Sequence, residues 1–284
     1  MRAGRVTHTL IRMRKHTVSS ADNTTIAYWT SGNGPPLILV HGTTADHTRW
    51  RQILPLLEPH ATLHAVDRRG RGDSGDGPDY SIDREFEDIA AVVHAVAGAT
   101  GGPVDVLGHS YGATCALGGA RLAGDALRRL VLYEPALSVK TPANLMDRLE
   151  ESSAAGRSAE VLDTFFREVV EMPPAELELL RALPAWQARL AAAHTIPREL
   201  YAEGDLHPEP DWLTSVTAPT LLLLGGDSPP WAAETTDVIR GALSDARVEV
   251  LPGQQHVAID TAPALFAEFV VTFLSGKDES VSVR

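Results

Sequence analysis

Short runs that are rich in apolar residues recur along this chain and alternate with longer segments of mixed polarity. The runs lie at residues 37–40, 62–66, 103–107, 129–133, 219–224 and 247–251. The run at 37–40 is unbroken, which is typical of a strand that is covered on both faces, and the other runs also predict strands. Helices are predicted at residues 46–57, 81–97, 113–122, 231–243 and 262–274, where apolar residues recur three and four positions apart. This alternation predicts an α/β fold with a mostly parallel central sheet and helices on both faces.

The two ends of the chain add a hairpin and two tails to this picture. Residues 17–30 are β-prone and partly alternating, and a turn cluster of two Gly and two Pro follows at 31–36. They predict a leading antiparallel hairpin, which gives a sheet of about eight strands. We expect residues 1–16, which are basic, to form a flexible extension and residues 276–284 to form a loose tail.

The strand–helix alternation stops between residues 137 and 215. Helical segments are predicted there at 143–155, 159–170, 175–183 and 185–203, separated by Gly156 and by prolines, with no strand candidate among them. We therefore expect a helical cap inserted after the sixth strand. The core would then consist of residues 17–136 and 216–275.

Composition narrows the range of partners. The 284 residues carry a formal net charge of -12, which argues against nucleic acid because phosphate binding needs a basic face. No apolar run approaches the length of a membrane span, and the single cysteine, Cys115, excludes an internal disulfide. We find no metal-ligand spacing and no glycine-rich phosphate loop. The expectation is a cytoplasmic protein that acts on a small molecule without a metal or cofactor, and a homodimer is left open.

The stretch Gly108-His109-Ser110-Tyr111-Gly112 joins a predicted strand to a predicted helix. A serine in such a sharp turn adopts a strained backbone and is lifted into the open. Glycine is needed two positions before and after it, because a Cβ at either position would collide with the neighbouring strand and helix. His109 should point away from Ser110 and play a structural role. Ser110 is therefore the candidate nucleophile.

A serine nucleophile needs a base, and the base needs a carboxylate that fixes its tautomer. In a parallel sheet such groups gather at the carboxyl ends of the strands. Of the eleven histidines, only His256 lies past the last predicted strand, so it is the candidate base. Asp227 and Glu134 each follow a strand and are the two candidates for the acid.

The chain resembles the α/β-hydrolase fold family, serine type with a helical lid. The resemblance rests on the order of Ser110, Asp227 and His256 along the chain. It also rests on His41-Gly42 after one predicted strand and on the loop 67–75 after the next. The resemblance covers residues 20–275 and implies that Asp227 is the acid, at the family's usual position in an open loop, while some relatives use the position of Glu134. It also implies an oxyanion hole made by the backbone N–H groups of Thr43 and Tyr111.

Two further expectations come from the same resemblance. The loop 67–75 would mainly brace the sheet, with its arginines paired to neighbouring acids or solvated. The lid would line the substrate pocket, and its candidate lining residues are Met146, Phe165, Phe166, Met172, Trp186 and Trp212. Of these, we take Trp186 and Met146 as the substrate-binding residues.

The expected function is that of a serine hydrolase that cleaves a carboxylic ester, or a thioester or lactone, of a small to medium apolar substrate through an acyl-enzyme. Carbon–carbon bond hydrolysis and perhydrolysis use the same three residues and are alternatives. The fold also hosts non-hydrolytic ligand-binding proteins and cyclases, which is the alternative from another class.

Overall fold

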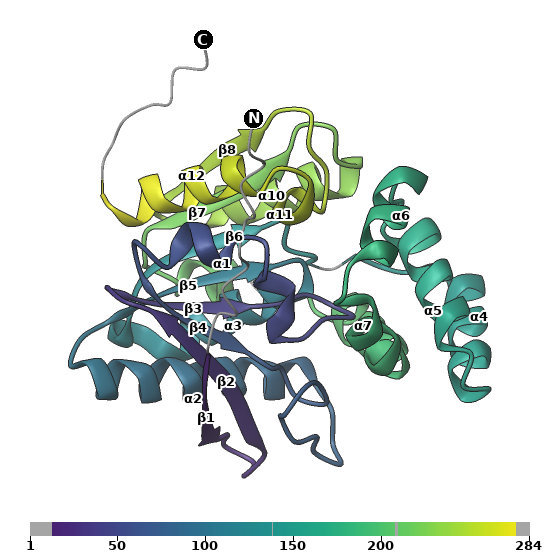
Figure 1. The fold of residues 1–284 in the computed structure, drawn as a ribbon, viewed down its shortest axis with the longest axis horizontal. Helices are drawn as coiled ribbons and strands as arrows, with labels where there is room; N and C mark the ends of the chain where they lie inside the picture. Colours follow the sequence, from purple (N-terminus) through teal and green to yellow (C-terminus); the bar gives the residue numbers. More distant parts are fainter. Residues whose placement is uncertain (1–12, 138, 208–209, 277–284) are drawn as a thin grey trace, which may run out of the picture.

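The computed structural model describes residues 13–137, 139–207 and 210–276. Its centre is an eight-stranded sheet in the order β1-β2-β4-β3-β5-β6-β7-β8 (Figure 1). The strands are β1 (Arg14–Ser19), β2 (Thr25–Gly32), β3 (Pro36–Val40), β4 (Thr62–Val66), β5 (Val104–His109), β6 (Leu127–Tyr133), β7 (Thr220–Gly225) and β8 (Ala246–Leu251). Strand β2 pairs antiparallel with β1 and β4, and all other pairs are parallel. The predicted sheet with its leading antiparallel hairpin is confirmed.

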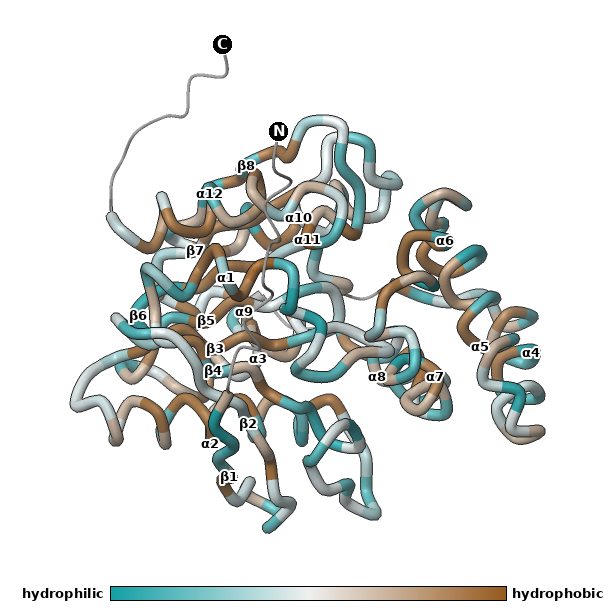
Figure 2. The backbone as a smooth tube through the Cα atoms, in the orientation of Figure 1, coloured by the Kyte–Doolittle hydropathy of each residue, from teal (hydrophilic) through white to brown (hydrophobic). Residues whose placement is uncertain are grey.

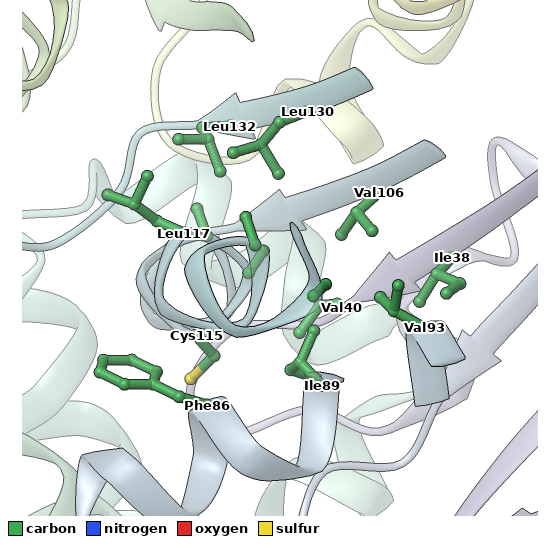
Figure 3. Packing of buried hydrophobic residues seen from close by; sticks show 14 of the residues in the cluster. Ile38, Val40, Phe86, Ile89, Val93, Val106, Cys115, Leu117, Leu130 and Leu132 are labelled. Carbon is green, nitrogen blue, oxygen red and sulfur yellow. The ribbon is translucent and has the colours of Figure 1, made fainter. Parts of the chain in front are cut away.

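Helices cover both faces of the sheet, as the pattern predicts. One face carries α2 (Ile82–Thr100), α3 (Tyr111–Ala123) and α10 (Pro230–Ala242), and the other carries α1 (Leu54–Leu57), α11 (Ala258–Thr261) and α12 (Pro263–Leu274). Successive strand residues point to opposite faces, so Ile38 packs with α2 and α3 while its neighbours Leu37 and Leu39 pack with α1 and α12. Figure 3 shows the first of these cores, where Phe86 and Ile89 of α2 pack against α3.

Two predicted helices are interrupted by proline. Residues 46–57 form a 3-10 turn, η1 (His47–Trp50), followed by the short α1. Residues 185–203 are divided into α7 (Trp186–Ala192), the 3-10 turn η4 (Ala193–Thr195) and α8 (Ile196–Gly204). Pro55 and Pro197 each lie in the first turn of the second helix, where the missing N–H is tolerated but a continuous helix is not.

The expected terminal tails lie mostly outside the described residues, which begin at 13 and end at 276. The prediction that the flexible extension reaches residue 16 is wrong. Strand β1 begins at Arg14, and Arg14 and His16 pair with Thr30 and Tyr28 of β2.

A helical segment follows β6, as predicted, and we call residues 143–214 the cap. It contains α4 (Ala143–Ala154), α5 (Ser158–Thr164), the π-helical turn η3 (Phe165–Val169), α6 (Pro174–Ala182), α7, η4, α8 and α9 (Pro210–Thr214). Its helices α4 to α7 stand to one side of the sheet in Figure 1, and Figure 2 shows hydrophobic stretches along α5 and α6. The cap has a core of its own, which includes Leu149, Leu162 and Leu177. None of the helices in the described ranges is long and apolar enough to cross a membrane.

Candidate active site

Ser110 lies at the junction of β5 and α3 with a backbone that non-glycine residues rarely adopt, φ 57° and ψ -132°. A Cβ on Gly108 would lie 2.5 Å from the Cα of Ala113, and one on Gly112 would lie 2.1 Å from the carbonyl oxygen of His41. The collisions predicted for this turn are therefore real. The Ser110 N–H donates to the carbonyl of Tyr133 at 2.9 Å, which fixes the turn against β6.

His256 and Glu134 form a hydrogen-bonded pair behind Ser110. The Nδ1 of His256 lies 2.6 Å from the Oε2 of Glu134, whose side chain is fully buried. The other carboxylate oxygen accepts hydrogen bonds from the Gly225 N–H at 2.7 Å and from the hydroxyl of Ser228. Because Nδ1 is engaged by the carboxylate, Nε2 is the ring nitrogen of His256 that is left for Ser110.

The expected pairing of Asp227 with His256 is corrected by this geometry. Asp227 is exposed, and its backbone N–H donates to the carbonyl of Gln254 at 3.0 Å. The end of β7 and the loop after it do reach the site, but Gly225 of the strand and Ser228 of the loop donate hydrogen bonds to Glu134, and the loop brings no carboxylate to His256. The sequence left Glu134 as the alternative, and this is the residue that the structure places beside His256.

Ser110 and His256 line a common pocket of about 20 Å³, which is room for roughly one water. The pocket lies between the core and the cap. Its core wall consists of Gly42, Thr43, Ala45, Arg49, His109, Ser110, His256 and Val257, and its cap wall consists of Phe165, Phe166, Val170, Leu180 and Arg189. The wall is therefore apolar on the cap side except for one arginine.

Thr43 and Tyr111, the expected oxyanion donors, flank the serine. Thr43 lines the pocket, and Tyr111 is the first residue of α3, where helix geometry leaves an N–H without an intrahelical acceptor. Within the described residues, neither backbone N–H has a hydrogen-bond acceptor. Both groups are thus available to a ligand.

The two expected substrate-binding residues of the cap are not part of this pocket. Met146 is buried in the cap core, and Trp186 packs against that core with its ring 6.2 Å from the ring of Phe166. Phe165 and Phe166 reach the pocket instead, from the π-helical turn η3. Such turns displace side chains from the positions of a regular helix.

The histidines near Ser110 have structural partners. The Nε2 of His109 lies 2.9 Å from the carbonyl of His256, and its ring stacks on Tyr133. His41 bridges the carbonyl of Gly42 and the N–H of Arg68. Burial lowers the pKa of both imidazoles well below the ordinary value, so both are neutral at pH 7. This agrees with the structural role predicted for His109.

The arginines of the loop after β4 are buried and paired with acids. Arg68 is bound by Glu85 and Glu199, and Arg71 is also bound by Glu199. Since Glu199 belongs to α8, these pairs join the core to the cap. Arg69 pairs in the same way with Asp88 and Asp22. The predicted bracing role of this loop agrees with the contacts.

One group of side chains in the described part of the chain has the spacing of a metal site, namely Asp46, His47 and Asp67. Their hydrogen bonds give them a structural role. Asp67 accepts from the N–H and Nδ1 of His47 and from the indole of Trp29, while Asp46 caps η1. The cluster thus fixes the loop after β4 against η1.

The chain has counterparts among known proteins, in sequence and in fold. Residues 37–269 match the model of the alpha/beta hydrolase family. The crystal structure of an alpha/beta hydrolase from Sphaerobacter thermophilus DSM 20745 is similar, with 35% sequence identity and a TM-score of 0.78, covering 91% of this chain and 100% of that one.

Two characterised relatives differ in what they act on. The 2-hydroxy-6-oxo-6-(2'-aminophenyl)hexa-2,4-dienoic acid hydrolase of Metapseudomonas resinovorans is 25% identical over 254 residues, which is 87% of each chain. Lipase LipV of Mycobacterium tuberculosis is 29% identical over 176 residues, which is 62% of this chain and 58% of the lipase. The family match covers most of the sheet and the whole cap, so the chain belongs to the alpha/beta hydrolase family.

Proposed function

We propose that this protein is a serine hydrolase that cleaves a carboxylic ester, or a thioester or lactone, through an acyl-enzyme. The observation that carries the proposal is the buried Glu134 carboxylate 2.6 Å from Nδ1 of His256, in a pocket that both His256 and the strained Ser110 line. A hydroxyl, an imidazole and a carboxylate in this order form a catalytic triad. The imidazole takes the proton of the serine hydroxyl, and the carboxylate orients the imidazole and stabilises its charged form.

Each step can be assigned to one of these groups. Nε2 of His256 takes the proton of Ser110 as the serine oxygen forms a bond to the substrate carbonyl carbon. The N–H groups of Thr43 and Tyr111 hold the resulting oxyanion. His256 then gives its proton to the leaving alcohol as the ester bond breaks. A water attacks the acyl carbon while Nε2 of His256 takes its proton. The bond between the acyl carbon and the Ser110 oxygen then breaks, His256 returns the proton to that oxygen, and the acid is released with Ser110 and His256 restored.

A carbon–carbon bond hydrolase is the second candidate, and a specific observation favours it. The relative from Metapseudomonas resinovorans is named for a dienoic acid that contains a ketone and no ester, so its hydrolysis has to break a bond to carbon. The same serine and histidine serve that reaction once the carbon leaving group is protonated.

Release of p-nitrophenol from p-nitrophenyl acetate and butyrate tests the proposal. We expect sustained turnover over many equivalents of enzyme. A single stoichiometric burst, or no release, would point to a ligand-binding or cyclase member of the fold. Loss of the dienoate chromophore of a 2-hydroxy-6-oxo-dienoic acid, measured in parallel, distinguishes the second candidate, because faster turnover of that compound would replace the ester assignment.

A further inference from the structure

Two arginines occupy the wall of the Ser110 pocket. Arg49 comes from η1 in the core and Arg189 from α7 in the cap. They are 4% and 5% exposed, so both guanidinium groups have left bulk water. Placing two buried cations beside a nucleophile is costly unless a negative charge compensates them.

Among the residues that the structure describes, only one of these two arginines forms an ion pair. Arg49 forms an ion pair with Asp260 at 2.7 Å, and its Nη2 has no hydrogen-bond partner among the described residues. Arg189 donates from Nη1 to the hydroxyl of Thr44 at 2.8 Å, and no carboxylate of the described chain lies within 4.0 Å of it. A hydroxyl satisfies a donor but does not neutralise a charge.

Other buried arginines of the chain show what a structural arginine looks like here. Arg68, Arg69 and Arg71 are each paired with at least one carboxylate. Arg189 is the exception among the buried arginines that the structure describes, and it lines the pocket together with Arg49. Burial and the neighbouring Arg49 lower the pKa of Arg189 to about 10, although the more distant charges of Asp260 and Asp46 act to raise it. Arg189 therefore keeps its proton at pH 7, and among the described residues it forms no direct ion pair.

A guanidinium in this position suits a carboxylate. Its planar fork matches the two oxygens, and such charge-assisted pairs are stronger than neutral hydrogen bonds. The Thr44 contact places Arg189 one residue from Thr43, the oxyanion candidate. The Arg189 guanidinium lies over the Phe166 ring, 5.6 Å from its centroid, as in a cation–π contact. The other cap residues of the pocket wall are apolar.

We propose that Arg189, with Arg49 beside it, binds a carboxylate of the substrate, so that this enzyme acts on short esters or related acyl compounds that carry a free acid. This inference rests on the proposed function of Ser110 and replaces the apolar substrate expected from the sequence. Substrate binding then brings the missing negative charge, and an uncharged ester of the same length leaves Arg189 unpaired.

The test compares monomethyl glutarate with methyl pentanoate, an uncharged ester of the same acyl length. We expect the wild-type enzyme to show a kcat/KM for the monoester at least about tenfold higher than for the neutral ester. Arg189→Met should lower the monoester value by about thirtyfold and change the neutral ester by less than about threefold, since one charge-assisted contact is lost. Arg189→Lys should recover part of the loss. Arg148→Met, which removes an exposed cap arginine, is the matched control and should change neither value.

A binding measurement keeps the proposal separate from the chemistry. Glutarate should bind the Ser110→Ala variant, measured by calorimetry, and binding should weaken by at least about tenfold when Arg189→Lys is added. If glutarate binds but no ester is turned over, the result would support the carboxylate-binding site and contradict the proposed hydrolase function. Equal turnover of both esters by the wild type, or glutarate binding that is unchanged in the arginine variants, overturns the anion site.

Discussion

The Oε2 of Glu134 lies 2.6 Å from the Nδ1 of His256, and this contact joins the end of β6 to the loop after β8. Glu134 has a left-handed backbone, φ 44°, that directs its side chain under the imidazole. Its N–H donates to the carbonyl of Leu223 at 3.1 Å, and Gly225 donates to its carboxylate, so β7 holds the acid in place. The acid of this site is therefore carried by one strand and supported by the next.

The choice between the two acids gives the first prediction. Glu134→Gln should lower kcat on a p-nitrophenyl ester by about a hundredfold or more, because the amide favours the wrong imidazole tautomer. Asp227→Asn should change kcat by less than about threefold, since Asp227 is exposed and does not contact His256. If Asp227→Asn lowered kcat more than Glu134→Gln, the result would indicate that Asp227, in the loop after β7, is the acid.

The cap wall gives a second prediction. Val170 lines the pocket, whereas its neighbour Val169 only packs against the cap core. Val170→Ala should raise kcat/KM for an ester one or two methylenes longer, relative to the shortest ester, by about fivefold or more. Val169→Ala is the control and should leave the chain-length profile unchanged. If both variants changed the chain-length profile of kcat/KM in the same way, the result would contradict the role of Val170 in the substrate pocket.

The buried pairs between core and cap give a prediction on stability. Glu199→Gln removes the carboxylate shared by Arg68 and Arg71, all of them buried. Breaking such a network should cost about 3–5 kcal/mol and lower Tm by roughly 6–15 °C. Glu168→Gln, which breaks an exposed pair with Arg148, should lower Tm by no more than about 2 °C. Equal melting temperatures for the two variants would show that the cap–core pairs do not stabilise the fold.

Acidification should weaken the fold through His64. Burial lowers the pKa of His64 from its ordinary value of 6.5 to about 4. Between these values the unfolded chain binds a proton that the folded chain does not, so the free energy of unfolding falls as pH falls from about 6.5 to about 4. Nε2 of His64 is buried and has no hydrogen-bond partner among the described residues, so a proton added there would leave a buried charged N–H without an acceptor.

Urea unfolding at pH 7 and pH 5 measures this effect. The loss of stability between the two pH values should be smaller in His64→Phe than in the wild type by about 1–2 kcal/mol. His60 is exposed, so His60→Gln should leave the loss unchanged. An identical pH dependence in all three proteins would show that His64 does not contribute to it.

The sheet and the serine turn could be predicted because their signals are local. Apolar runs identify the strands, and glycines on both sides of Ser110 are required by contacts within the turn itself. The proline signal at Pro55 was equally local and explains why the helix expected at 46–57 is interrupted. These features follow from short stretches of sequence.

The acid and the cap wall depend on packing between distant segments. Both Asp227 and Glu134 follow a strand, and only the backbone of each loop decides which side chain turns inward. In the same way, the π-helical turn brings Phe165 and Phe166 to the pocket in place of Met146 and Trp186. Arg49 and Arg189 carried no motif in the sequence, and only their burial beside Ser110 identifies them.

Covalent labelling tests the central claim, that Ser110 is the nucleophile of a hydrolase. A fluorophosphonate reagent reacts with a serine only when a neighbouring base activates it. Peptide mapping by mass spectrometry should find one adduct, on Ser110, and ester hydrolysis should be lost in proportion to labelling. An adduct on another serine, or full labelling of Ser110 with hydrolysis retained, would contradict the assignment.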